Sequence, residues 1–341
     1  MTSSTMSRQA LARSPSRSRA LPVVAAVAAG AVVPVQSRVN AELSHRLGDG
    51  TAAATISFTG GLIIMSVLAL LLPGLRRALK DLPAATRERG LPRRYLLAGA
   101  LGGTFALAQS TVALVTGIAV FTVSAIAGQT VGGLIVDARG VGGGVRRRPG
   151  VHRLAGALLT LVAAVVSALP GLAGVPSAAT VLLPALLAVL GGLLLGLQQA
   201  MNGTTGAAVA SPLAATWVNF AVGSIVLGLA LTAKTLAGGT SGAAQPTAWW
   251  MYLGGLCGVV FIGTAAVLVR RIGVLLLGMA SIAGQLAGSI VLDAVPPSGD
   301  HPPGAFTVAG ALLTFAAVWI AARRSGLPNN TKERPCRTTA S

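Results

Sequence analysis

The fold of this chain is decided by a twelve-residue stretch that occurs twice. The first copy is IAGQTVGGLIVD at residues 126–137, and the second is IAGQLAGSIVLD at residues 282–293. Both read Ile-Ala-Gly-Gln-x-x-Gly-x-x-x-x-Asp, and the second copy is displaced by 156 residues. The repeat indicates that the chain contains two versions of one module. It also places a glutamine inside an apolar segment twice.

The composition indicates a membrane protein that crosses the bilayer many times. Of the 341 residues, 53% are hydrophobic and only 10% are charged. About 20 consecutive apolar residues are needed to cross a hydrocarbon core of ~30 Å, and runs near that length recur along the chain. We predict an all-α protein with ten membrane-spanning helices, at residues 21–40, 51–72, 95–115, 118–137, 153–171, 179–200, 213–236, 248–269, 272–293 and 304–322.

The basic residues are distributed unevenly between the segments that join these spans. If the N-terminus is cytoplasmic, all but three of the 26 Lys and Arg residues fall on the cytoplasmic side, the exceptions being Arg38, Arg46 and Lys234. This bias follows the positive-inside rule and predicts that both termini are cytoplasmic. It accounts for the net charge of +18 without nucleic acid as a partner. We expect the basic segments to contact anionic lipid instead.

The repeat extends beyond the opening stretch. In the first half, Gln36-x-x-x-Asn40 is followed by Phe58-x-x-Gly61, and the same residues return 162 positions later as Gln198, Asn202, Phe220 and Gly223. Spans 1 to 5 therefore correspond to spans 6 to 10. Because five is odd, the two halves must cross the membrane in opposite orientations, as in many secondary transporters.

We thus predict a five-plus-five inverted repeat. The first five-helix repeat is expected at residues 20–172 and the second at residues 173–322, with disordered basic tails at residues 1–19 and 323–341.

This organisation resembles the drug/metabolite transporter superfamily. Ten spans in two inverted halves, cytoplasmic termini, and the paired Gln-x-x-x-Asn and Phe-x-x-Gly motifs are similar to its EamA-like bacterial inner-membrane transporters. The resemblance covers residues 20–322 and implies a multi-pass protein of the inner (plasma) membrane. It also implies that the protein is a secondary transporter or exporter of small polar metabolites that works by alternating access. The small multidrug-resistance relatives carry a Glu within their first span, and span 1 here has none, which argues against proton antiport of cationic drugs.

The repeated glutamines, Gln129 and Gln285, are the first candidates for a substrate site. A buried amide without a hydrogen-bond partner costs roughly 2–7 kcal/mol on transfer scales. Each glutamine therefore either lines a polar cavity where the repeats meet or joins helices through a hydrogen bond. Such bonds contribute about 0.6 kcal/mol on average in membranes. The sequence leaves both interpretations open.

Further amides lie on shared helical faces. Gln36 and Asn40 are neighbours on one face because they are four residues apart, and so are Gln198 and Asn202. Gln199 adds an amide on an adjacent face. We expect these residues near span ends, where they either contact water and headgroups or form a gate or an amide-lined entrance to a cavity.

Three other residues have two interpretations each. Asp137 and Asp293 end their spans, although a helix C-terminus disfavours an acidic side chain. A local ion pair of Asp137 with Arg139, or an interfacial position for Asp293, is the simpler explanation, and a gating role is the alternative. Trp217, two residues before Asn219, either stacks on a substrate or packs between helices.

Other classes of function are disfavoured. An integral-membrane enzyme would need acids, histidines or cysteines that converge near one face, whereas the eight acids and three histidines are scattered. The chain has no phosphate-binding loop of an ATP-driven pump, and no metal or cofactor is expected. The expected partners are a small-molecule substrate and the lipid bilayer, and the sequence leaves open whether the protein forms a homodimer. A structural or regulatory membrane protein without transport activity is the alternative.

Overall fold

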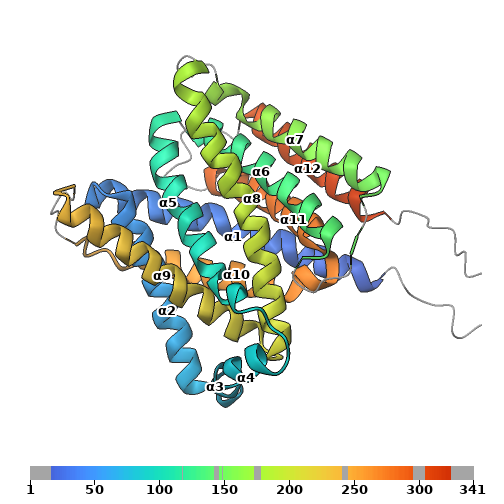
Figure 1. Cartoon of the computed structure of the whole chain (residues 1–341). Coiled ribbons are helices and arrows are strands. Elements are labelled where there is room, and N and C mark those ends of the chain that lie inside the picture. Colours follow the sequence, from blue (N-terminus) through green and yellow to red (C-terminus); the bar gives the residue numbers. More distant parts are fainter. Residues whose placement is uncertain are drawn as a thin grey trace, which may run out of the picture.

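The computed structural model describes residues 17–116, 118–141, 146–147, 149–172, 178–239, 245–294 and 304–323. All regular structure in these ranges is helical (Figure 1). The long helices are α1 (Arg17–Leu47), α2 (Gly50–Leu71), α5 (Ala98–Thr116), α6 (Ile118–Arg139), α7 (Val151–Leu172), α8 (Ala178–Ala208), α9 (Pro212–Leu236), α10 (Gly254–Ile272), α11 (Val274–Ala294) and α12 (Ala305–Ala322). The short elements are α3 (Pro73–Lys80), α4 (Leu82–Arg87) and the 3-10 helices η1 (Arg93–Leu97) and η2 (Trp249–Tyr252).

Nine helices of the described chain, all the long ones except α5, are long and apolar enough to cross a membrane. Their outer faces carry apolar side chains. On α7, apolar residues spaced by three or four positions form one stripe, and each of them is 41% to 64% exposed: Leu154, Leu158, Val162, Val165 and Leu169. Such a stripe would be unfavourable in water and faces hydrocarbon favourably in a bilayer.

The predicted spans match the long helices, but α1 and α8 are longer than expected. Each has 31 residues and continues past the predicted ends at residues 40 and 200. The sequence predicts that Gln198, Gln199 and Asn202 lie near a span end, where they either contact water and headgroups or form a gate or an amide-lined entrance. Instead they are buried by neighbouring helices, so they do not locate the membrane boundary.

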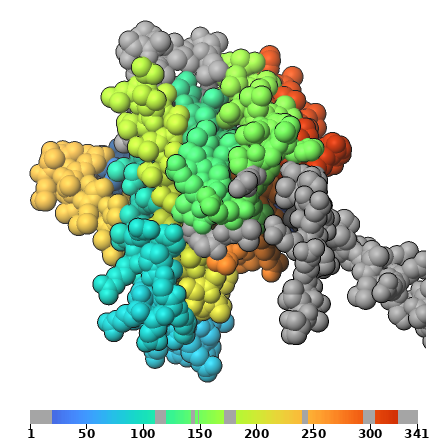
Figure 2. All heavy atoms as spheres, turned by 45° about the vertical axis from the view of Figure 1, so that its right-hand side comes forward, coloured from blue at the N-terminus to red at the C-terminus, as the bar shows by residue number. Residues whose placement is uncertain are grey.

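The basic segment after α2 folds into α3 and α4. These helices bury Leu75, Ala78 and Ala85 while Arg76 and Arg77 stay exposed. They project from one end of the bundle, as both views show (Figures 1 and 2). Burial on one side and charge on the other makes this segment amphipathic.

Long helices from the two halves of the chain pack against each other. α1 lies along α11, α6 along α8, α7 along α12 and α2 along α9. A methyl group added at Gly128 or Gly192 would overlap backbone atoms of the facing helix at the α6–α8 contact. Gly284 and Gly30 are placed in the same way at the α11–α1 contact. At these glycines the missing side chain lets the two helix backbones approach closely.

The helix directions follow from these contacts. Gly128 faces Val189 and Gly132 faces Leu193, so α6 and α8 run in the same direction. The equivalent glycines of α11 face residues 27 and 31, so α11 and α1 also run in the same direction. In contrast, α6 and α11 cross in opposite directions, because residue 133 lies against residue 275 while residue 129 lies against residue 278.

One turn is built twice. Gly48 after α1 and Ala210 after α8 both have left-handed backbone, with φ of 62° and 51°. The next residue then caps the following helix with its side chain. Asp49 has φ −148° and ψ 104°, and Ser211 has φ −145° and ψ 101°. The turns are 162 positions apart, as are the repeated amides.

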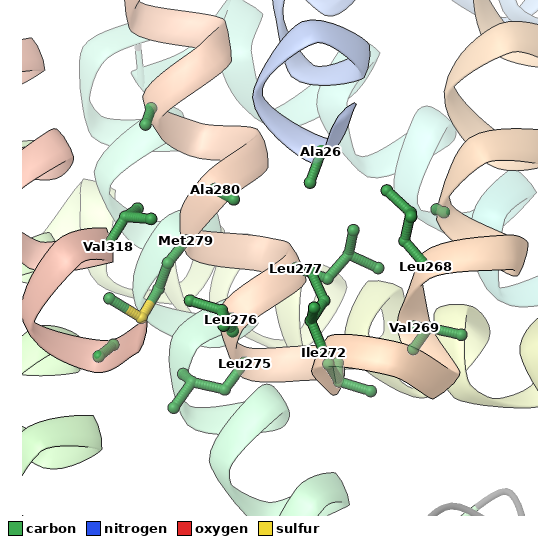
Figure 3. Packing of buried hydrophobic residues seen from close by; sticks show 14 of the residues in the cluster. Ala26, Leu268, Val269, Ile272, Leu275, Leu276, Leu277, Met279, Ala280 and Val318 are labelled. Carbon is green, nitrogen blue, oxygen red and sulfur yellow. The ribbon is translucent and has the colours of Figure 1, made fainter. Parts of the chain in front are cut away.

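The largest buried apolar cluster lies around the junction of α10 and α11. Ile272, Leu275, Leu277 and Met279 are almost completely buried there, and Ala26 of α1 and Val318 of α12 cover them (Figure 3). A second apolar contact, between α2 and α9, is symmetric. The ring centroids of Phe58 and Phe220 lie 5.4 Å apart. Phe220 packs on Gly61 of α2, and Phe58 packs on Gly223 of α9. These contacts fix the frame in which the polar residues are held.

Replacing Gly192 with alanine is expected to lower the thermal unfolding midpoint of the purified protein. The added methyl group would overlap the carbonyl of Ala125, and overpacking of this kind costs about 1–3 kcal/mol. Gly228→Ala is the matched control, since a methyl group there meets no atom within 4 Å. Equal midpoints for the two variants would contradict the close-packed α6–α8 contact.

Candidate functional site

A buried group of amide side chains lies between α8 and α9. Gln198 Nε2 donates to Asn219 Oδ1 at 2.8 Å, and Asn202 Nδ2 donates to the same oxygen at 3.0 Å. All three side chains are at most 4% exposed. α5 makes room for them, because a methyl group at Gly102 would overlap the Gln198 amide. The amide triad, Gln198, Asn202 and Asn219, is therefore held inside the bundle.

The predicted position of Gln198 and Asn202 at a span end is wrong. α8 continues to Ala208, and α9 supplies their hydrogen-bond partner. Sequence analysis did not give Asn219 this role. The signal was present, however, because Asn219 is the one amide residue in the predicted span at residues 213–236.

The equivalent residues of the first half form a less connected group. Gln36 and Asn40 are partly buried in α1 and face α10, where a methyl group at Gly258 would lie 3.1 Å from Gln36 Nε2. Asn40 Oδ1 is buried without a hydrogen-bond partner in the described chain. The position equivalent to the α9 asparagine is Ser57, which has no amide. The two halves thus carry polar residues at equivalent positions, but the hydrogen bonds of these residues differ.

The repeated glutamines have different surroundings. Gln129 on α6 is buried and lies against Gly278 of α11, and its Nε2 has no partner among the described residues. Gln285 on α11 is only partly buried. No hydrogen bond joins their side chains within the described residues. Within the described residues, Gln129 Nε2 therefore makes no hydrogen bond to another helix.

Trp217 connects α9 to α2. Its Nε1 donates to Ser66 Oγ at 3.1 Å, and its ring packs against the apolar cluster between these helices. Both the polar and the apolar part of the side chain are therefore used within the bundle. This favours the packing interpretation for Trp217.

Asp137, at the end of α6, joins three helices. Its carboxylate accepts hydrogen bonds from the backbone N–H groups of Val274 at 2.8 Å and Leu275 at 3.3 Å, the first two residues of α11. It also accepts a hydrogen bond from Arg153 Nη2 of α7 at 2.8 Å. The expected pair with Arg139 is not formed, and Arg153 takes its place. The positive end of α11 stabilises the carboxylate, which explains why an acid is tolerated at the end of α6.

Arg147 extends this junction to α10. Its Nη2 donates to the carbonyls of Arg271 at 2.9 Å and Arg270 at 3.3 Å, in the last turn of α10. Gly273 follows with φ 88°, and a methyl group there would lie 2.6 Å from Asp137 Oδ2. We call Asp137, Arg147 and Arg153 the junction cluster. Asp293 ends α11 in the equivalent sequence position, but its side chain lies outside the described residues.

A second ion pair lies at the opposite end of the bundle. α1 and α11 run in the same direction, so Asp49, which follows α1, is far from the start of α11. Asp49 Oδ1 lies 2.7 Å from Lys234 Nζ at the end of α9. Burial raises the pKa of Asp49, but the Lys234 hydrogen bond and charge and two backbone N–H groups lower it, and the net pKa is below the ordinary 3.8. Sequence analysis did not pair these residues.

Replacing Lys234 is expected to change how the thermal stability of the protein depends on pH. Because the folded pKa of Asp49 is lowered, its carboxylate stabilises the fold above pH 3.8, and this contribution is lost as the pH falls through the lowered pKa. Lys234→Met should therefore unfold at a lower temperature than the wild type at neutral pH. The difference should shrink below pH 3.8, where Asp49 becomes protonated. A difference that stays constant as Asp49 becomes protonated would show that the ion pair does not contribute.

Comparison with known proteins identifies the family. The family described as "Putative inner membrane exporter, YdcZ" matches residues 21–166 and 183–320. The two matched segments fall in the two halves defined by the repeats, and together they span most of the chain. No curated protein matches the chain. The resemblance to the drug/metabolite transporter superfamily is confirmed, and the protein is a multi-pass protein of the inner membrane. The chain belongs to the DMT_YdcZ family.

Proposed function

We propose that this protein is a secondary transporter that exports small polar metabolites without net charge by alternating access. Its binding site forms beside the buried amides of the bundle. The observation that carries the proposal is a set of buried amide atoms that have no hydrogen-bond partner in the described chain: Asn40 Oδ1, Gln129 Nε2, both amide atoms of Gln199, and Asn219 Nδ2. Each unpaired buried group costs about 1–3 kcal/mol. A bundle that served only as structure would avoid that cost, and a polar solute would offset it.

The charge distribution favours uncharged or zwitterionic substrates. The buried ion pairs of the described chain, Asp137 with Arg153 and Asp49 with Lys234, lie at helix ends. The amide triad has no charged hydrogen-bond partner within the described chain. A solute with strong net charge would lose hydration there without gaining a counter-ion.

The helix directions support an inverted repeat of ten spans, with α5 as the tenth. α6 is equivalent to α11 by sequence, and the two run in opposite directions. Since α1 is parallel to α11 and α8 is parallel to α6, the equivalent helices α1 and α8 are also opposed. Two inverted halves require that equivalent helices run in opposite directions. From the positive-inside bias, we assign both termini to the cytoplasm.

The ion pairs at the two ends are suited to act as gates. A cavity of about 20 Å³ lies at the junction cluster and one of about 10 Å³ lies beside the amide triad. Each has room for about one water molecule. A metabolite therefore needs one end of the bundle to open. We assign Asp137 to the cytoplasmic gate and Asp49 with Lys234 to the opposite gate, where Asp293 is the sequence counterpart of Asp137.

Purified protein in liposomes is expected to release at least one neutral or zwitterionic member of an internal metabolite panel faster than protein-free liposomes do. Asn202→Leu with Asn219→Leu should reduce that release at least about tenfold, because the substrate loses hydrogen-bond partners. Gln245→Leu, at an exposed position paired with Tyr252, is the control and should keep wild-type release. No release of any panel member by the wild type, with or without a proton gradient, would contradict the proposal.

Asp137→Ala is expected to loosen the cytoplasmic gate. A cysteine introduced at Ala200, which lines the cavity at the junction cluster, should then react faster with a small polar thiol reagent, in a background with Cys257 and Cys336 replaced by serine. Asp81→Ala removes an exposed ion pair with Arg89 and is the matched control. Equal labelling rates in the two variants would show that Asp137 is not part of the gate.

A further inference from the structure

Gln199 has the least satisfied side chain among the amides of α8. It is 3% exposed, and both Oε1 and Nε2 are buried without a hydrogen-bond partner among the described residues. Its neighbour Gln198 is bonded to Asn219. The side chain is therefore unexplained by the packing of the bundle.

Gln199 borders the cavity between α8 and α10. On α8 the wall consists of Leu195 and the three amides at 198, 199 and 202, and on α10 it includes Phe261 and Ile262. None of the lining residues carries a charge. The cavity thus combines one unpaired amide, an aromatic ring and aliphatic side chains.

One turn further along α8, the two helices come together and limit the cavity. A methyl group at Gly203 would overlap the side chain of Val269 on α10. A volume of about 10 Å³ holds about one water molecule. A larger solute therefore enters when α8 and α10 separate, which is the kind of movement that alternating access requires.

The chemistry of a free amide restricts what it can pair with. It presents an acceptor and a donor side by side in one plane. The complementary group presents a donor and an acceptor in the same arrangement, as a carboxamide, a lactam or the edge of a nucleobase does. A carboxylate offers two acceptors and an amidinium two donors, so each can pair with only one atom of Gln199, and no lining residue neutralises its charge.

We propose that Gln199 is the residue at which the transporter recognises its substrate, and that the substrate is a small, planar, uncharged solute with a carboxamide-like edge. The edge pairs with the Gln199 amide while the planar body packs against Phe261 and Ile262. This inference rests on the proposed export function and names its substrate class.

The test uses three planar probes of one shape: benzamide, benzoate and benzamidinium. They differ in whether the head group offers a donor with an acceptor, two acceptors or two donors. Equilibrium binding of each to the purified full-length protein is expected to be tightest for benzamide. Gln199→Leu should weaken benzamide binding by about tenfold to a hundredfold. Gln199→Glu should shift the preference towards benzamidinium, and Gln245→Leu is the control that should bind like the wild type.

Thermal unfolding of the same variants separates recognition from a structural role. Gln199→Leu should unfold at the wild-type temperature or higher, because it removes a buried amide that has no partner. Gln198→Leu should unfold at a lower temperature, because it breaks the bond to Asn219. A lower midpoint for Gln199→Leu would show that the side chain stabilises the bundle and would contradict the proposal.

The binding results decide the inference independently of the export function. Equal binding of benzamide and benzoate by the wild type, or unchanged benzamide binding in Gln199→Leu, would overturn it. Wild-type release of other solutes from liposomes that does not depend on Gln199 would overturn it while leaving export intact. Gln199-dependent benzamide binding without release of any solute would support the site and contradict export.

Discussion

Hydrocarbon offers no hydrogen-bond partner, and this constraint governs every polar group in the bundle. The backbone meets it by forming long helices. The side chains meet it in two ways: the amides of Gln198 and Asn202 bond to Asn219, and Asp137 bonds to the first N–H groups of α11 and to Arg153. Against this background the unpaired atoms of Gln129 and Gln199 are exceptions. Exceptions of this kind mark functional sites more often than defects.

Glycine pairs make the rest of the arrangement possible. Where α6 meets α8 and α11 meets α1, glycines on both sides let the backbones touch. These two contacts, each of which joins one half to the other, have the same form, whereas the polar residues of the halves differ. Asn219 corresponds to Ser57, and the buried Asp49 that pairs with Lys234 corresponds to Ser211. A duplicated frame thus carries two different sets of polar contacts: its two ends have different ion pairs, and its two amide groups have different hydrogen bonds.

Much of this frame can be predicted from the sequence, because span length and repeated glycines are local signals. The partners of polar residues cannot be predicted in that way, since they come from distant segments. Asp137 lies two residues from Arg139, yet it bonds to Val274 and Arg153 because α11 and α7 begin beside it. The extra length of α8 was missed for the same reason: its amides are shielded by α9, and the sequence of α8 alone does not show this.

The opposite orientation of the two halves is the central claim, and equivalent turns test it most directly. His45 and Ala207 are 162 positions apart and both exposed, near the ends of α1 and α8. Cysteines introduced there in turn, with Cys257 and Cys336 replaced by serine, can be treated with a membrane-impermeant thiol reagent on intact cells. The account predicts labelling of His45→Cys from outside and labelling of Ala207→Cys only after the membrane is permeabilised. Labelling of both from the same side would contradict it.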